Sequence, residues 1–472
     1  MIKYKLMKVL LLNPPFKENY IRSARSTWPS ISGSNWYPIF LAYATGWLEK
    51  HGHKAKLLDA LVAHLSPAEV YSRVKQFRPE ITALYISAES LTNDLKIGLK
   101  IKKINGSKIV LVGPWCSTHP QKILSQNKEI DAIIPREFDQ VLLDLANKKP
   151  PEKIKGLVFR RGKEIMVNPE RDFLKPEQLN QFPFVTEVYK KHLNIEKYHQ
   201  ASLLHPFVDL FTGRGCSWGK CSFCLWPNTI HRGAANYRTR SPENVIQELL
   251  FIKKELPEVK EVFFQDDTLP AWRAKEISQL IIKRKIKITW SCYARADALM
   301  DLKTLKLMKK AGCRFLHVGY ESADPAILKN INKGTTPGIM KKFTEDAQKS
   351  GLKIHGDFIL GLPGETEQTI KNTIKWAQEL GIEGYQFFIP QPQPETPLFN
   401  YLKKKGCLKQ NNQINYPQLT AEQLNYWRFK AMRSIYFTPK YLFNTLGSLN
   451  SKDDLFRLIR TGFFALPKML KK

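Results

Sequence analysis

The sequence is short of acidic residues and has no long apolar run. Asp and Glu number 43 against 74 Lys and Arg, which gives a formal net charge of +31 at pH 7. Such an excess of positive charge does not indicate a fold. It favours an anionic partner, such as nucleic acid, an acidic membrane face, or a phosphorylated or carboxylated substrate. Because the positive charge is spread along the chain, a well-solvated surface explains it equally well.

No stretch of 18 apolar residues occurs, which excludes a membrane-spanning helix. The opening MIKYKLMKVLLLNPPF is broken too early, by Pro14 and Pro15, to be the apolar core of a signal peptide. Cysteines are few, seven in all, and three of them stand within nine residues, which argues against a disulfide framework. These absences predict a cytoplasmic protein in a reducing compartment, with peripheral membrane contact left open.

Strand-like and helix-like segments alternate in two long runs, so the predicted fold class is α/β. The first run predicts a doubly wound, Rossmann-like parallel sheet, whose ligands bind at the carboxyl ends of the strands. Asn13, Ser87 and Gly113 fall at such ends. The second run has six strand–helix repeats and predicts a partial (β/α)6 barrel with its chemistry at the same end of the strands. The expected domains are 1–145 (Rossmann-like), 146–206 (a linker), 207–400 (the barrel) and 401–472 (a helical, basic tail).

Three cysteines follow the first strand of the barrel directly, in the stretch FTGRGCSWGKCSFCLWPN. Cys216, Cys221 and Cys224 have the spacing C-x4-C-x2-C. Three thiolates on one loop can hold three corners of a [4Fe–4S] cluster, and the missing fourth leaves one iron open to another ligand. With His231 the same cysteines would instead make a Cys3His zinc site, so the spacing alone leaves both metals open.

This loop, together with the segments that follow it, resembles the radical S-adenosylmethionine (SAM) superfamily. That family places three cysteines after the first barrel strand, most often as C-x3-C-x2-C, so the first gap is one residue longer here. Phe223 matches the family's usual aromatic residue between the last two cysteines. The resemblance implies that the open iron binds the amino and carboxylate groups of SAM. One electron, from a reductant such as flavodoxin or ferredoxin, then cleaves SAM to methionine and a 5′-deoxyadenosyl radical.

Four further landmarks of the family follow in the expected order at strand ends. An acidic segment after the second strand is implied to face the SAM amino group, although an acidic helix N-terminus would look the same. An arginine after the third strand is implied near the SAM carboxylate, a Gly-Tyr-Glu-Ser segment contacts SAM, and a Gly-rich turn faces the adenine. The residues implied are Gln265, Asp266, Asp267, Arg295, Glu321, Ser322, Ile359 and Gly361.

The N-terminal run is similar to the cobalamin-binding domain that many members of this family carry. The similarity rests on Asn13–Pro14–Pro15 and on Val112–Gly113–Pro114. It implies cobalamin as a further cofactor, with contacts at Asn13, Ser87 and Gly113. There is no Asp-x-His-x-x-Gly motif, so no histidine from that motif would ligate the cobalt. A degenerate domain that keeps the fold without the cofactor is the alternative.

Residues 224–245 resemble a subgroup tied to hopanoid lipid biosynthesis. This implies a lipid (hopanoid-like) or polyol substrate that is methylated or rearranged. A radical SAM enzyme that modifies RNA is an alternative, but Cys116 alone in the first run cannot supply the extra cluster of the methylthio-transferring members, so nucleic acid is disfavoured. A zinc-stabilised binding protein without catalysis is the third interpretation, and it leaves the downstream landmarks unexplained.

The tail interleaves basic and aromatic residues. Residues 430–472 contain nine Lys or Arg and two Asp. Basic side chains beside Trp, Phe and Leu suit a membrane interface. Amphipathic helices that pack over the open mouth of the barrel would give the same pattern.

Overall fold

The computed structural model describes residues 6–22, 27–230, 237–410, 412–439, 441–443 and 452–470. The chain forms two compact units. One comprises the described part of residues 1–30 with residues 34–199 and 208–210, and the other residues 31–33, 200–207 and the described residues from 211 onward. The predicted α/β class is confirmed in both. The domain limits at residues 145, 206 and 400 stay a prediction. No helix in the described ranges has the length and apolarity needed to cross a membrane.

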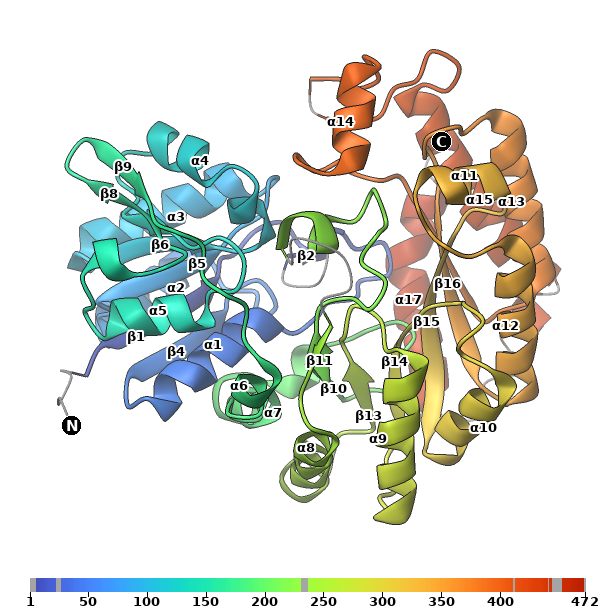
Figure 1. The fold of residues 1–472 in the computed structure, drawn as a ribbon, viewed down its shortest axis with the longest axis horizontal. Coiled ribbons are helices and arrows are strands. Elements are labelled where there is room, and N and C mark those ends of the chain that lie inside the picture. Colours follow the sequence, from blue (N-terminus) through green and yellow to red (C-terminus); the bar gives the residue numbers. More distant parts are fainter. Residues whose placement is uncertain are drawn as a thin grey trace. The chain divides into compact units, whose positions relative to one another are not determined.

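A seven-stranded mixed sheet forms the centre of the first unit, in the order β4-β1-β5-β6-β7-β8-β9 (Figure 1). The first five strands of that order are parallel, and the β8–β9 hairpin continues the sheet antiparallel. The strands are β1 (Lys8–Asn13), β4 (Lys54–Asp59), β5 (Ile81–Tyr85), β6 (Lys108–Val112), β7 (Ala132–Ile133), β8 (Val158–Arg161) and β9 (Glu164–Val167), with a separate pair β2 (Tyr20–Ile21) and β3 (Trp28–Pro29).

Helices cover both faces of this sheet, as a parallel sheet requires. Helices α1 and α5 pack on each other, and α2 packs on α3. Val70, Val74, Ile97 and Ile101 of the second pair meet the buried strand residues in one apolar core. The helices are α1 (Ile39–Lys50), α2 (Pro67–Phe77), α3 (Leu91–Asn105), α4 (Pro120–Gln126), α5 (Asp139–Ala146), α6 (Pro176–Leu179) and α7 (Val185–His192).

The second unit is built on a six-stranded parallel sheet, in the order β10-β13-β14-β15-β16-β17, of which residues 208–210 of β10 group with the first unit. Because the strands are parallel, their C-termini lie at one end of the sheet. The strands are β10 (Phe207–Leu210), β13 (Glu261–Phe264), β14 (Trp290–Ala294), β15 (Cys313–Glu321), β16 (Lys353–Ile359) and β17 (Gly384–Phe388), with a small antiparallel pair β11 (Gly213–Arg214) and β12 (Arg238–Thr239).

Helices connect these strands and continue into the tail (Figure 1). Thr420 caps α15 with a reciprocal capping box, and α15 packs against β17. The helices are α8 (Pro242–Glu255), α9 (Ala271–Lys283), α10 (Leu302–Lys310), α11 (Pro325–Asn330), α12 (Pro337–Lys349), α13 (Glu367–Leu380), α14 (Pro397–Lys404), α15 (Ala421–Tyr436) and α17 (Lys452–Leu470).

Candidate functional site

The cysteine loop leaves β11 and is shaped by its own backbone. Cys216, Cys221 and Cys224 are all partly exposed and free of disulfides. The Cys224 amide donates to the Cys221 carbonyl over 3.2 Å, and the Asn228 side-chain amide donates to the Cys221 and Cys224 carbonyls over 3.1 and 2.6 Å. The Gly219 amide donates to the Cys216 sulfur over 3.4 Å. These hydrogen bonds hold the path of the loop.

Three contacts tie the middle of this loop to the rest of its unit. Ser222 is buried, and its amide donates to the Ile331 carbonyl over 3.0 Å while its carbonyl accepts from Leu398 over 3.1 Å. The Trp218 indole donates to the Asn332 carbonyl over 2.8 Å. A Cβ on Gly334 would stand 2.0 Å from the Trp218 ring, so only glycine lets the two segments approach this closely.

The donor set of the loop fits an iron–sulfur cluster. Its side chains offer three soft thiol ligands and no carboxylate, the set that such clusters use. Burial raises the pKa of the Cys221 thiol, and the nearby Lys333 and Arg295 charges oppose that rise. In the described ranges no three Cys, His, Asp or Glu side chains already stand together as a metal-binding group. His231, the fourth ligand of the zinc alternative, lies outside the described residues.

An ion-pair cluster stands beside the loop. Glu321 ends β15 with a positive φ of 66°, and Lys333 Nζ lies 2.6 Å from its Oε1. Both side chains are at most one-tenth exposed. Arg295, just after β14, donates to the Lys333 carbonyl, and its guanidinium lies 4.4 Å from the centre of the Trp218 ring. The structure thus joins the loop to the ends of β14 and β15, and Lys333 and Trp218 are members that the sequence did not predict.

Gln265 and Asp266 at the end of β13 have different environments. Gln265 is 1% exposed, and neither polar atom of its side chain finds a hydrogen-bond partner among the described residues. Asp266 is fully buried and accepts from the Thr212 amide and hydroxyl, each over 2.6 Å, and from the Tyr237 hydroxyl over 2.5 Å. Asp266 therefore fastens β13 to the start of the cysteine loop. Gln265 has the unpaired buried atoms expected of a ligand contact, and Asp267 beside it is buried as well.

The predicted adenine turn is built around a buried carboxyl group. Ile359 ends β16, and Gly361 follows with a φ of 94°. The Gly361 amide donates to Glu365 Oε2 over 3.3 Å, and its carbonyl accepts from the Tyr416 hydroxyl over 3.1 Å. Burial raises the pKa of Glu365 to about 7, although the Thr369 hydroxyl and two amides lower it. Ser322 is fully buried and accepts from the Asp324 amide, which gives it a turn-forming role.

In the first unit, Asn13 and Ser87 meet at the carboxyl edge of the sheet through a buried polar network. Arg22 donates to Asn13 Oδ1 over 2.9 Å and pairs with Asp94 over 3.1 Å, and both charged side chains are fully buried. Ser90 connects Asp94 to Ser87, with Oγ–Oδ2 and Oγ–Oγ distances of 2.5 and 2.7 Å. Burial raises the pKa of Asp94 to about 6, against the Arg22 charge. The sequence did not predict the Arg22–Asp94 pair.

The same edge carries buried polar atoms that have no hydrogen-bond partner among the described residues, which fits a polar cofactor. The Tyr85 hydroxyl at the end of β5 has no partner among the described residues, nor have Trp115 Nε1 and His119 Nδ1 in the segment after β6. Gly113 begins that segment with a φ of 112°, and a Cβ there would lie 3.0 Å from the Ile86 carbonyl oxygen. His64 is exposed with a φ of 55°, away from any motif that would ligate cobalt.

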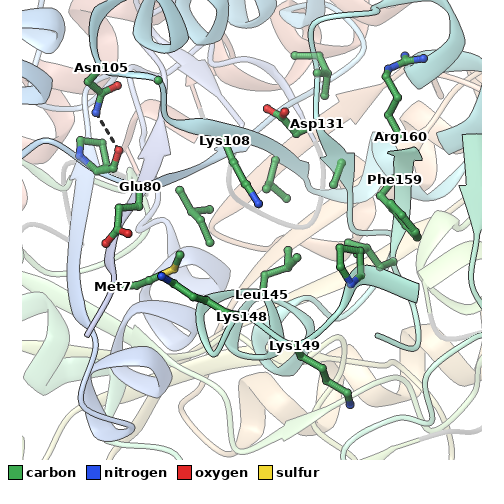
Figure 2. Close-up of a pocket in the computed structure, with 18 of the residues that line it drawn as sticks. Met7, Glu80, Asn105, Lys108, Asp131, Leu145, Lys148, Lys149, Phe159 and Arg160 are labelled. Carbon is green, nitrogen blue, oxygen red and sulfur yellow. Dashed lines mark hydrogen bonds between the residues drawn. The ribbon is translucent and has the colours of Figure 1, made fainter. Parts of the chain in front are cut away.

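A cavity of about 960 Å³ lies at the other edge of this sheet. Figure 2 shows Met7, Glu80, Lys108 and Lys148 among the residues that line it. These residues lie at or near the amino ends of β1, β5 and β6 and after α5. The cavity is therefore separate from Asn13, Ser87 and Gly113, which stand at the carboxyl ends.

Comparisons with known proteins identify the family of this chain. Residues 210–377 match the family model described as the radical SAM superfamily. An uncharacterized methyltransferase of Pyrococcus horikoshii is 30% identical over 454 residues, which cover 93% of this chain and 94% of the relative. The chain belongs to the radical SAM superfamily. It is accordingly a radical SAM enzyme, whose cofactors include a [4Fe–4S] cluster and SAM.

Two solved structures share the fold of this radical SAM enzyme over most of its length. The cobalamin-dependent SAM radical enzyme OxsB has a TM-score of 0.70 at 16% identity, over 97% of this chain and 72% of its own. The radical SAM methyltransferase TsrM of Kitasatospora setae has a TM-score of 0.66 at 16% identity, over 86% of this chain and 79% of its own. The predicted combination of a Rossmann-like unit and a radical SAM barrel is thereby confirmed.

Proposed function

We propose that this radical SAM enzyme is a cobalamin-dependent methyltransferase that acts on an unactivated carbon of a lipid-like or polyol substrate. The observation that carries the proposal is the joining of the cysteine loop to Arg295, Lys333 and Glu321 through Trp218. A methyltransferase relative and two fold relatives described with cobalamin support the methyl-transfer part. A rearrangement on the same substrate class is the alternative outcome, and the hopanoid-like sequence block supports the lipid class.

In this proposal Cys216, Cys221 and Cys224 hold the cluster, and the neighbouring ion pairs hold the amino-acid end of SAM. When bound, the cluster and SAM supply a one-electron cleavage that yields a carbon radical, and cobalamin supplies a methyl carrier. Arg295 and Lys333 present positive charge to a carboxylate, and Glu321 presents negative charge to an ammonium group.

The remaining residues orient and enclose the ligands. Gln265 offers an amide whose two polar atoms are buried without partners, so a SAM polar group would satisfy them. The backbone at Ile359 and Gly361 faces the adenine, on a turn fixed by Glu365. Asn13, Ser87 and Gly113 form the edge at which cobalamin binds, with the Tyr85 hydroxyl and the Trp115 and His119 nitrogens available to its polar groups.

Metal analysis after anaerobic purification tests the cluster assignment. Iron, sulfide, zinc and cobalt would be measured on the wild type, on Cys221→Ala and on Cys407→Ala, which changes a buried cysteine outside the loop. We expect about four irons and four sulfides per chain, lost only in Cys221→Ala. Zinc without iron, even after reconstitution, would contradict the proposal and leave a zinc-stabilised protein.

A further inference from the structure

Helix α17 carries a continuous stripe of large apolar side chains on its exposed side. They are Leu455, Phe456, Ile459, Phe463, Leu466 and Leu470, exposed by 46%, 57%, 61%, 74%, 44% and 63%. At about 100° per residue these positions fall within an arc of about 100°, and they extend over about 22 Å of helix. Contiguous exposed apolar surface of this kind marks an interaction site more often than a solvated face.

The other sides of α17 are fastened to its own unit. Arg460 donates to the Gly33 carbonyl over 3.1 Å, and the Phe464 ring occupies the space where a Gly33 Cβ would stand, 2.3 Å away. Arg433 of α15 donates to the Met469 carbonyl over 3.4 Å, and Met469 is buried. Because these contacts fix the rotation of the helix about its axis, the stripe has a defined outward orientation.

The preceding tail helix, α15, buries its large apolar side chains instead of exposing them. In α15 the side chains of Leu424, Trp427, Met432 and Ile435 are all less than a tenth exposed, and the helix packs on β17. Helix α15 therefore buries its apolar face on a barrel strand, whereas α17 keeps its main apolar face outside. Leu442 and Phe443, between the two helices, add exposures of 50% and 75%.

We propose that α17 seats this enzyme on an anionic lipid bilayer, with the stripe in the acyl–headgroup boundary. The positive charge of the tail favours a lipid surface over other partners. The tail from residue 430 has nine Lys or Arg against two Asp, and the whole chain carries +31. Such charge attracts anionic headgroups and repels a second copy of the same chain. An amphipathic helix lying in the interface needs only one apolar face, which is what α17 offers.

Vesicle sedimentation of the purified full-length enzyme tests this proposal without any turnover. The probes are vesicles of phosphatidylcholine alone and vesicles of equal parts phosphatidylcholine and phosphatidylglycerol. We expect binding to the anionic vesicles that weakens at high salt, and little binding to the neutral ones. The double substitution Ile459→Glu with Phe463→Glu should weaken binding by at least about tenfold, since it puts two charges into the apolar boundary. Val167→Glu, at a 50% exposed valine on β9, is the control that should bind like the wild type.

Three results would overturn it. The wild type could remain in the supernatant with anionic vesicles, or the double variant could bind them as tightly as the wild type. Light scattering could instead show a dimeric wild type and a monomeric double variant, with no vesicle binding by either protein. The stripe would then be a subunit interface. Thermal unfolding and iron content of the variants, which should match the wild type because both substituted side chains are exposed, distinguish these outcomes from misfolding.

Discussion

Glu321 and Lys333 are nearly buried, and their charged atoms lie 2.6 Å apart. Removing one partner of a buried ion pair leaves the other charge uncompensated, which typically costs about 3–5 kcal/mol. We expect Lys333→Met to lower the free energy of unfolding by an amount toward the lower end of that range, because both side chains keep some contact with water. We also expect it to weaken SAM binding by about tenfold or more, measured by equilibrium dialysis on the cluster-loaded enzyme.

Two variants control this prediction. Lys342→Met removes a surface lysine that pairs with Asp346 one turn away on α12, and such pairs contribute little. The double substitution Glu321→Gln with Lys333→Met removes both charges and should restore much of the stability without restoring SAM binding. Equal SAM affinity in the wild type and Lys333→Met would contradict the assigned role.

Glu365 has a raised pKa, about 7 against a usual 4.5. The folded protein therefore binds this proton more tightly than the unfolded chain does. The resulting stabilisation is complete below about pH 4.5 and is lost as the pH rises through 7, by at most about 3 kcal/mol. We expect Glu365→Gln to be more stable relative to the wild type at pH 8 than at pH 5, measured by urea unfolding across that range. Parallel profiles for the two proteins would show that the carboxyl group does not titrate there.

Whether a residue of the site could be predicted depends on whether its function shows in the sequence around it. Cys216, Cys221 and Cys224 were predictable because three thiols at short spacing carry their chemistry in the sequence itself. Lys333 was not predictable, because it is one of 74 Lys and Arg and its partner Glu321 stands twelve residues away. The Arg22–Asp94 pair spans 72 residues and depends on the sheet to bring it together. Their positions as ligand contacts stay predictions until the variants are measured.

Among the elements, the segment between α11 and α12 matters because it receives the cysteine loop. Gly334 there has a φ of 66°, and its Cβ position lies 2.0 Å from the Trp218 ring. We expect Gly334→Ala to displace Trp218 and to reduce both stability and bound iron. Gly338→Ala, four residues later on the first turn of α12, meets nothing nearer than 4.0 Å and should be neutral or stabilising by about 0.5 kcal/mol. Equal iron content in the two variants would show that the loop does not need this anchor.

Long elements with local signals were predictable, and so was the short hairpin of β8 and β9, but some short elements were not. Helices α2 and α13 follow the N-caps Ser66 and Thr366, which form reciprocal capping boxes, so periodicity and caps agreed. The two-residue strands β11 and β12 pair Arg214 with Arg238, 24 positions later in the chain. No local sequence pattern indicates either strand. Helix α11 has six residues, which is too short for helical periodicity to be visible.

At the scale of the whole molecule, the proposal assigns different cofactors to different units, so their loss should be separable. Gly113→Ala strains a backbone with φ 112° and brings a Cβ to 3.0 Å from the Ile86 carbonyl. We expect it to lower bound cobalt while iron stays at the wild-type level, and Cys221→Ala to do the reverse. Metal analysis of the same samples reports both. Loss of iron and cobalt together in Gly113→Ala would mean that the substitution unfolds the protein or that the assignment is wrong.

The order of strand and helix in two runs was enough to predict two α/β units, because parallel strands need covering helices between them. The relation of sheet order to chain order in the first unit, where β1 lies between β4 and β5, was not predictable from alternation. The composition did not identify the partner, because a net charge of +31 favours several kinds of anionic partner. The exposed stripe on α17 favours a lipid surface among them.

Electron paramagnetic resonance of the reduced enzyme, with and without SAM, tests the central claim most directly. The account predicts a [4Fe–4S] signal that changes when SAM is added, because three cysteine ligands leave one iron open. It further predicts a weaker change at the same SAM concentration in Lys333→Met, which keeps the three cysteines. A cluster signal that SAM leaves unchanged, or no cluster signal after reconstitution, would contradict the account.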